Sequence, residues 1–216
     1  MSKRENKGRF IVFEGLEGSG KTTQLYNLQR KLLDYGIVCI NKKEPSDGII
    51  GSIAQSAAQR MIELEQETLA LLFAADRVEH LVKKLIPALR SGITVLCDRY
   101  FFSTLAHQSL FVPIKRLLEF NGLVAESRMP DLTIFLDVPP RVCSDRLSAW
   151  QLALELNDDV NTLSMIRENY FEIFEAYRDK TNICVVDGTQ SIGDVSEIIW
   201  NEASKLFDLE QSEFSE

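Results

Sequence analysis

Short apolar runs alternate with longer amphipathic stretches along this chain. The apolar runs lie at residues 10–13, 38–40, 94–97, 132–136 and 183–186. Runs of this length without polar alternation are typical of strands in a parallel sheet that is covered on both faces. The pattern therefore predicts an α/β fold.

The stretches between these runs have the periodicity of helices. In the first of them, Leu25, Leu28 and Leu32 recur at helical spacing and Gly36 ends the pattern. Helices are predicted at residues 21–35, 51–64, 66–89, 102–109, 114–126, 141–156, 163–178 and 195–207. Residues 157–161 are predicted to form a loop, and the acidic segment 208–216 a frayed tail. No linker or repeat divides residues 1–216, so a single domain is expected.

Composition narrows the possible functions. The chain has 24 Lys and Arg against 32 Asp and Glu, a formal charge of −8, so a broad nucleic-acid-binding surface is not expected. The four cysteines form no C-x-x-C pair, which disfavours zinc and disulfides and favours reduced thiols in the cytoplasm. No apolar run approaches the roughly 18 residues of a membrane span. A soluble protein without a membrane partner is expected.

The strongest motif follows the first apolar run. The segment GLEGSGKT matches G-x-x-x-x-G-K-[ST] and opens a helix, so its backbone N–H groups are expected to cradle the phosphates of ATP. We expect Lys21, in a solvent-facing loop, to reach the β- and γ-phosphates, and the Thr22 hydroxyl to bind Mg²⁺. The alternative is a glycine turn that binds nothing. The predicted cofactor-binding residues are Gly15, Leu16, Glu17, Gly18, Ser19, Gly20, Lys21, Thr22 and Thr23.

A second metal-binding group is expected at the carboxyl end of the third predicted strand. Asp98 follows the run at residues 94–97, and ligands of α/β sheets gather at the carboxyl ends of strands. This position suits a Walker-B carboxylate that binds Mg²⁺ or its waters. The alternative is an aspartate that caps the following helix.

Among nucleotide-binding proteins, a GTPase is disfavoured because the nearest match to its N-K-x-D motif is NKKE at residues 41–44. A small phosphotransferase fits the chain length better. The segments FIVFEGLEGSGKTTQ, LLFAADRVEH, DRYFFSTLAHQ and PDLTIFLDVPP resemble, in this order, four blocks of the thymidylate kinases. The resemblance implies a P-loop kinase fold with a five-stranded parallel sheet in the order 2-3-1-4-5, helices on both faces and a short lid at residues 147–162. It also implies ATP, Mg²⁺ and dTMP as ligands, dTDP as product, and a homodimer.

The resemblance also assigns acceptor-binding residues. It implies that Phe73 stacks on the base and that Arg77 and Arg99 bind the monophosphate, a role that suits arginine forks. Ser103, Thr104 and Gln108 are further candidates for the base edge. The alternatives are that Phe73 is a core residue, that Arg77 pairs with an acid, and that Ser103 and Thr104 are helix caps.

Three departures from the family pattern leave other functions open. Acidic Glu17 in the phosphate loop resembles the family members whose mobile cation is in the lid, but residues 147–166 contain no Lys or Arg. Arg146 is therefore the first candidate for the catalytic cation and Arg167 the second. For Arg146, adenine stacking and a surface ion pair remain alternatives.

The other two departures concern the acceptor. The loop KEPSDG at residues 43–48 stands where the family has R-E-P-G-G-T, which introduces Asp47. His107 replaces the aromatic residue that excludes a ribose 2′-hydroxyl, and it could donate to that hydroxyl or simply fill the space. A kinase for another monophosphate and a weakly catalytic nucleotide-binding regulator therefore remain alternatives.

Overall fold

The computed structural model describes residues 7–122, 128–149, 160–207 and 209. Five parallel strands form one sheet in the order β2-β3-β1-β4-β5. The strands are β1 (Phe10–Gly15), β2 (Cys39–Lys43), β3 (Thr94–Asp98), β4 (Leu132–Asp137) and β5 (Ile183–Asp187). The α/β class and the strand order predicted from the sequence are confirmed.

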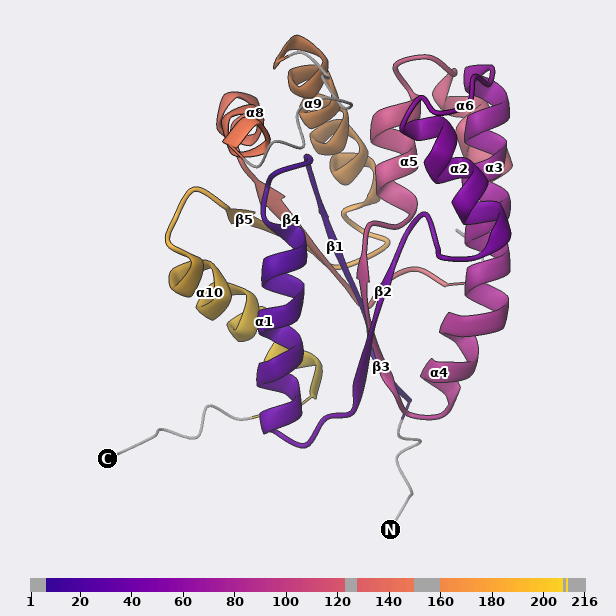
Figure 1. Cartoon of the computed structure of the whole chain (residues 1–216). Helices are drawn as coiled ribbons and strands as arrows, with labels where there is room; N and C mark the ends of the chain where they lie inside the picture. The colour runs from indigo at the N-terminus through magenta and orange to yellow at the C-terminus, as the bar shows by residue number, and fades with distance from the viewer. Residues whose placement is uncertain (1–6, 123–127, 150–159, 208, 210–216) are drawn as a thin grey trace.

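The helices connect consecutive strands and cover both faces of the sheet (Figure 1). The described helices are α1 (Lys21–Asp34), α2 (Ile49–Ala58), α3 (Gln66–His80), the π-helix η1 (Leu81–Leu85), α4 (Ile86–Arg90), α5 (Phe101–Gln108), α6 (Ile114–Phe120), α8 (Pro140–Ala149), α9 (Val160–Tyr177), α10 (Ile192–Ser204) and the 3-10 helix η3 (Lys205–Phe207).

The core has two layers because successive strand residues point to opposite faces of the sheet. On β1, Ile11 and Phe13 pack with the apolar faces of α1 and α10. Phe10 and Val12 pack with apolar side chains from α3, α5 and α9. All strands are parallel, so their carboxyl ends lie together at one edge, where Phe13 on β1 and Lys43 on β2 are both in register with Asp98 on β3.

Two predicted elements differ from the sequence pattern for identifiable reasons. The strand predicted at residues 38–40 extends from Cys39 to Lys43, because an edge strand tolerates polar residues that a buried strand does not. The helix predicted at residues 66–89 consists of α3, the π-turn η1 and α4. Pro87 lacks the N–H that an α-helix would use here, which accounts for a wider turn just before it.

Other predicted boundaries are wrong by a few residues. The helix predicted at residues 51–64 begins at Ile49 and ends at Ala58. The loop predicted at residues 157–161 is wrong at its end, since α9 begins at Val160. The last helix begins at Ile192 because the Ser191 side chain accepts a hydrogen bond from the Asp194 N–H, a capping signal that the sequence analysis missed.

The predicted lid and tail lie largely outside the described residues. Residues 150–159 of the lid and all of the tail except Leu209 belong to the undescribed part of the chain. Residues 147–149 and 160–162, at the two ends of the predicted lid, belong to α8 and α9. All four cysteines are free, and three of them are buried. Within the described ranges, no helix has the length and apolar character needed to cross a membrane.

Candidate active site

The phosphate loop leaves β1 and enters α1 at the carboxyl edge of the sheet, where two positions require glycine. At Gly15 an added Cβ would lie 2.9 Å from the Leu136 carbonyl oxygen. At Gly18, which has a φ of 78°, it would lie 2.7 Å from the Cys143 carbonyl oxygen. A residue with a side chain would therefore displace the loop from β4 or α8, so the sequence motif has a packing basis as well as a conformational one.

Lys21 lies inside the loop, so the expectation of a solvent-facing side chain is wrong. Its side chain is only 5 % exposed, and Nζ donates a hydrogen bond to the Leu16 carbonyl oxygen at 2.8 Å. Burial lowers the pKa of Lys21, and the charge of Arg99 lowers it further. The ammonium group points at the concave side of the loop, where a bound phosphate would take the place of the carbonyl as its partner.

Thr22 and Asp98 meet as the sequence predicts. The Thr22 hydroxyl donates to Oδ2 of Asp98 at 2.7 Å, which brings the first turn of α1 to the end of β3. A hydroxyl beside a single carboxylate fits Mg²⁺, which takes oxygen ligands and completes its shell with water and substrate phosphates. The described residues contain no cluster of three or more His, Cys, Asp or Glu side chains that could hold a metal by themselves. Thr23, the next predicted cofactor-binding residue, is exposed on α1.

Glu17, Arg99 and His107 form a second group around the loop. Arg99, at a φ of 69°, donates to Oε2 of Glu17 at 2.5 Å, and Lys21 lies 3.9 Å from the same carboxylate oxygen. The charges of Lys21 and then of Arg99 lower the pKa of Glu17, so its carboxylate is ionised. The Glu17 side chain is 51 % exposed. Two cations therefore share one carboxylate that is half exposed to solvent.

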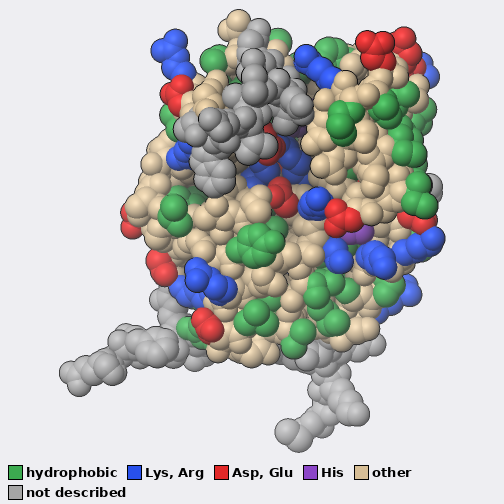
Figure 2. Space-filling model, viewed as in Figure 1, with side chains coloured by type: hydrophobic (Ala, Val, Ile, Leu, Met, Phe, Trp, Pro, Cys, Tyr) green, Lys and Arg blue, Asp and Glu red, His purple; other side chains and the backbone are tan. Residues whose placement is uncertain are grey.

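His107 is a neutral acceptor in this group. Its Nε2 lies 3.3 Å from Nη1 of Arg99, which can only donate, so the proton of the ring is on Nδ1. Burial and the charges of Arg99 and Lys21 lower the pKa of His107 to about 3. In Figure 2, basic and acidic side chains gather in the hollow at this edge of the sheet.

Glu14 is a functional residue that sequence reasoning missed. It is fully buried at the end of β1, where it accepts the backbone N–H groups of Tyr100 and Ser103 and the hydroxyls of Ser103 and Tyr170. Burial raises the pKa of Glu14, although the hydrogen bond from Ser103 opposes that rise. The carboxylate caps the first turn of α5 and so fixes the turn that carries Arg99. Ser103 is engaged in this support, so its hydroxyl is not free for a base edge.

Arg77 lies in a separate buried network. Its side chain is 2 % exposed and donates to Glu44 at 2.6 Å, Asn121 at 2.6 Å, Thr104 at 2.7 Å and the Tyr100 carbonyl at 3.2 Å. A guanidinium group has five N–H donors, so a single donor remains for a ligand. Arg77 and Arg99, which the sequence analysis placed together on one phosphate, do not share a partner.

The remaining acceptor candidates lie on α3 and α5. Phe73 is partly exposed one helical turn before Arg77, and its ring has no aromatic partner among the described residues. Gln108 is partly exposed at the end of α5. Both are available to a ligand that lies between these helices.

The two arginines considered for the mobile cation differ in their partners. Arg146 on α8 donates to the carbonyls of Gly18, Ser19 and Gly188 at 3.3 to 3.5 Å, which places it against the phosphate loop. Arg167 on α9 forms a two-pronged pair with Asp137 at 2.6 and 2.8 Å. Arg146 makes only long contacts, whereas Arg167 is fixed.

The site has three parts: a phosphate loop after β1, a threonine and aspartate pair beside it, and cations around an exposed carboxylate. This combination is typical of a P-loop phosphotransferase. Comparison with known proteins identifies its family. The thymidylate kinase family model matches residues 13–199. A thymidylate kinase of Bacillus cytotoxicus is 37 % identical over 214 residues, covering 93 % of this chain and 99 % of that protein.

Two further relatives give the same result. A thymidylate kinase of Geobacillus sp. (strain WCH70) is 34 % identical, and a probable thymidylate kinase of Pyrococcus horikoshii is 35 % identical. Each alignment covers 88 % of this chain and 92 % of the relative. The chain therefore belongs to the thymidylate kinase family.

Proposed function

We propose that this protein transfers the γ-phosphoryl group of ATP to dTMP, giving ADP and dTDP. The observation that carries this proposal is the position of Arg99, which faces the phosphate loop and is held there by the half-exposed carboxylate of Glu17. The names of the relatives support dTMP as the acceptor. We place the reaction in the cytoplasm, which suits the four free thiols.

A panel of nucleoside monophosphates with ATP and Mg²⁺, with coupled detection of ADP, tests the proposal. We expect the highest kcat/KM with dTMP. A higher kcat/KM with another monophosphate would show that the chain is a kinase for that monophosphate. ATP binding without turnover of any acceptor would favour a nucleotide-binding regulator.

The proposed roles follow from the contacts. The phosphate loop and Lys21 bind the phosphates of ATP, and Arg99 binds the acceptor phosphate in exchange for Glu17. Thr22 and Asp98 would hold Mg²⁺, which neutralises charge on the phosphates when bound. Phosphoryl transfer needs mainly alignment and charge neutralisation, so no general base is assigned.

Arg146 is proposed as the cation that acts in the transition state. It lies beside the phosphate loop and its contacts there are long, so it can move toward the transferred group. Replacement by alanine is then expected to lower kcat with little change in either KM, while Arg167→Ala changes kcat little. A raised KM for ATP would instead assign Arg146 to the adenine, and an unchanged kcat in both variants would exclude both arginines.

His107 supports the alternative acceptors. The Nδ1–H of its neutral ring is a donor suited to a ribose hydroxyl, where the family has an aromatic residue. We expect His107→Tyr to lower the kcat/KM ratio of UMP to dTMP. An unchanged ratio would show that the imidazole only fills the space.

We propose that the protein is a homodimer. Apolar side chains are exposed on α2, α3 and α6, which pack side by side, and they include Ile49, Ile53, Leu71, Ile114 and Leu118. Exposed apolar side chains on neighbouring helices are typical of an interface. Leu71→Glu is expected to give a monomer in sedimentation experiments, whereas Ile192→Glu, on the opposite side at α10, leaves the dimer intact. A monomeric wild type would contradict the proposal.

A further inference from the structure

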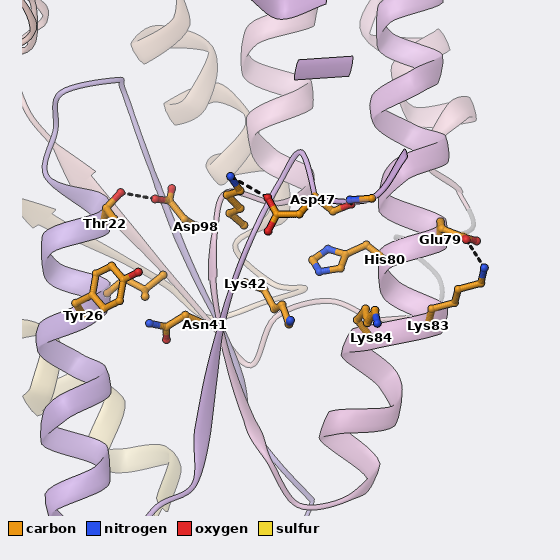
Figure 3. A pocket seen from close by; sticks show the side chains of 14 residues that line it. Thr22, Tyr26, Asn41, Lys42, Asp47, Glu79, His80, Lys83, Lys84 and Asp98 are labelled. Atoms are coloured by element: carbon orange, nitrogen blue, oxygen red, sulfur yellow. Dashed lines mark hydrogen bonds and ion pairs between the residues drawn. The ribbon is translucent and has the colours of Figure 1, made fainter. Parts of the chain in front are cut away.

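A large cavity lies beside the edge strand β2, next to the phosphate loop. Its volume is about 780 Å³, within the range of small-molecule sites. It lies between α1 and the junction of α3 with η1 (Figure 3). It shares Thr22 and Asp98 with the proposed metal site, but Lys21, Arg99 and Phe73 do not line it. The cavity is therefore a neighbour of the catalytic cleft and not part of it.

The charges of the cavity favour an anion. Lys42 on β2 and Lys84 on η1 line it, and neither has an ion-pair or hydrogen-bond partner in the described part of the chain. Lys43 and Lys83 also line it, but each is paired with an acid four residues away on the surface. Exposed pairs of this kind contribute little and can exchange for a ligand. Four lysines and three carboxylates (Asp47, Glu79 and Asp98) line the cavity, so its net charge is positive in a chain whose net charge is −8.

His80 adds a polar group aimed at the same space. Its side chain is more than nine-tenths buried, and Nδ1 lies 3.3 Å from Oε1 of Glu44. The other ring nitrogen, Nε2, has no hydrogen-bond partner among the described residues. Figure 3 shows the ring projecting from α3 into the cavity. Because Nδ1 faces a carboxylate, it is the nitrogen that donates, and Nε2 is an acceptor suited to a hydroxyl of a ligand.

An aromatic surface stands at the opposite wall. Tyr26 on α1 lines the cavity and is 55 % exposed, and Figure 3 shows it across β2 from Lys84. Any nucleic-acid base can stack on an aromatic ring of this kind. Lysines at one end and an aromatic ring at the other match a nucleotide, which carries its charge and its ring at opposite ends.

We propose that this cavity is a second nucleotide site, which binds the phosphates of a nucleoside triphosphate through Lys42 and Lys84 and its base on Tyr26. The site adjoins the γ-phosphate cradle at Thr22 and Asp98 but does not include Lys21. Through His80 and Glu44 it also borders the network of Arg77.

Calorimetry with a non-hydrolysable ATP analogue and Mg²⁺ tests this proposal. We expect two binding sites in the wild type and one in the double variant Lys42→Glu/Lys84→Glu, with the first affinity changed less than about twofold, because the charges reversed lie outside the phosphate loop. Lys180→Glu, beyond α9 at the amino-terminal edge of the sheet, is the matched charge control and should keep both sites. A single site in the wild type up to millimolar analogue, or two sites in the double variant, would overturn the proposal.

Two further measurements distinguish binding of the phosphates from binding of the base: the affinity of the second site for inorganic tripolyphosphate, and the effect of Tyr26→Ala. If the base binds, the second site holds the ATP analogue at least about tenfold more tightly than tripolyphosphate, and Tyr26→Ala removes that difference. Equal affinity of the two probes in the wild type would overturn the nucleotide assignment, because it would show a site for phosphates alone. Loss of the first site in Lys21→Ala with retention of the second would separate this inference from the proposed kinase function.

Discussion

Two arginine clusters at the carboxyl edge of the sheet differ in how fully their charges are satisfied. In the phosphate cluster, made of Glu17, Lys21 and Arg99, two cations share one carboxylate that is half exposed. In the buried arginine cluster, made of Glu44, Arg77 and Asn121, the single cation donates four hydrogen bonds to protein groups. The first cluster retains positive charge for a ligand, whereas the second uses its donors to hold the fold together.

The contacts that hold Arg99 and Arg77 in place differ in the same way, since those of Arg77 are more extensive. Arg99 stands in the turn after β3, and its position depends on the Glu14 carboxylate, which caps α5, and on the half-exposed Glu17 carboxylate. Arg77 stands within α3 and joins this helix to α5 and to the residues that directly follow β2 and α6. A change at Arg77 is therefore expected to act mainly on stability, and a change in the phosphate cluster mainly on activity.

The largest effect on stability is expected from Arg77→Ala. This substitution leaves the buried Glu44 carboxylate without its main partner, which typically costs about 3 to 5 kcal/mol. Urea denaturation of both proteins measures the difference in the free energy of unfolding. The double variant Arg77→Ala/Glu44→Gln removes the stranded charge and should recover part of the loss. A cost below about 1 kcal/mol for the single variant would show that the buried cluster has no such structural role.

Lys21→Ala is expected to have the largest effect on catalysis. Loss of a positioned charge at the transferred phosphates lowers kcat by about 10²-fold or more. The fold should persist, since the polar contacts of Lys21 in the described part of the chain stay within its own loop, at Leu16 and Glu17. Steady-state rates with dTMP and circular dichroism measure the two quantities, and Lys31→Ala on the outer part of the same helix is the control. Retention of more than about a tenth of the wild-type turnover would reject the loop as the catalytic site.

Arg99→Ala is expected to weaken the acceptor more than ATP. A charge-assisted contact to a phosphate contributes roughly 1.5 to 3 kcal/mol, so the KM for dTMP should rise about ten- to hundredfold. Arg116→Ala, which removes a surface pair with Glu67, should leave both KM values unchanged. An equal rise in the KM values for ATP and dTMP would show that Arg99 does not bind the acceptor specifically.

The sequence predicted those features that depend on local pattern. The phosphate loop follows from glycine spacing after an apolar run, and the meeting of Thr22 with Asp98 follows from the shared edge of parallel strands. The strand order came from the family resemblance and is confirmed.

Sequence reasoning missed features that depend on long-range packing. Glu14 and Glu44 are single carboxylates beside or within strands, and nothing in their neighbours shows that one caps α5 and the other neutralises Arg77. The burial of Arg77 could not be predicted either, because helical spacing places it near Phe73 but does not show that four acceptors from other elements surround it. The one available signal was the acid at the end of an otherwise apolar strand, which requires partners when it is buried.

The smallest effect is expected in the pH dependence of stability and arises from His107. Its pKa in the folded protein is about 3, lowered by burial and by the charges of Arg99 and Lys21, against about 6.5 when unfolded. Between these values the unfolded chain binds a proton that the folded chain does not, so stability rises with pH up to about 6.5.

The variant His107→Gln removes this titration and keeps an acceptor for Arg99. We expect its free energy of unfolding to vary less than that of the wild type between pH 5 and 6.5, and the two curves to run parallel above about pH 7. Other groups, among them buried Glu14 with its raised pKa, titrate alike in both proteins, so the difference between the curves isolates His107. Curves that stay parallel down to pH 5 would show that burial beside Arg99 does not lower the pKa of His107, because the folded and unfolded chains would then take up the same proton.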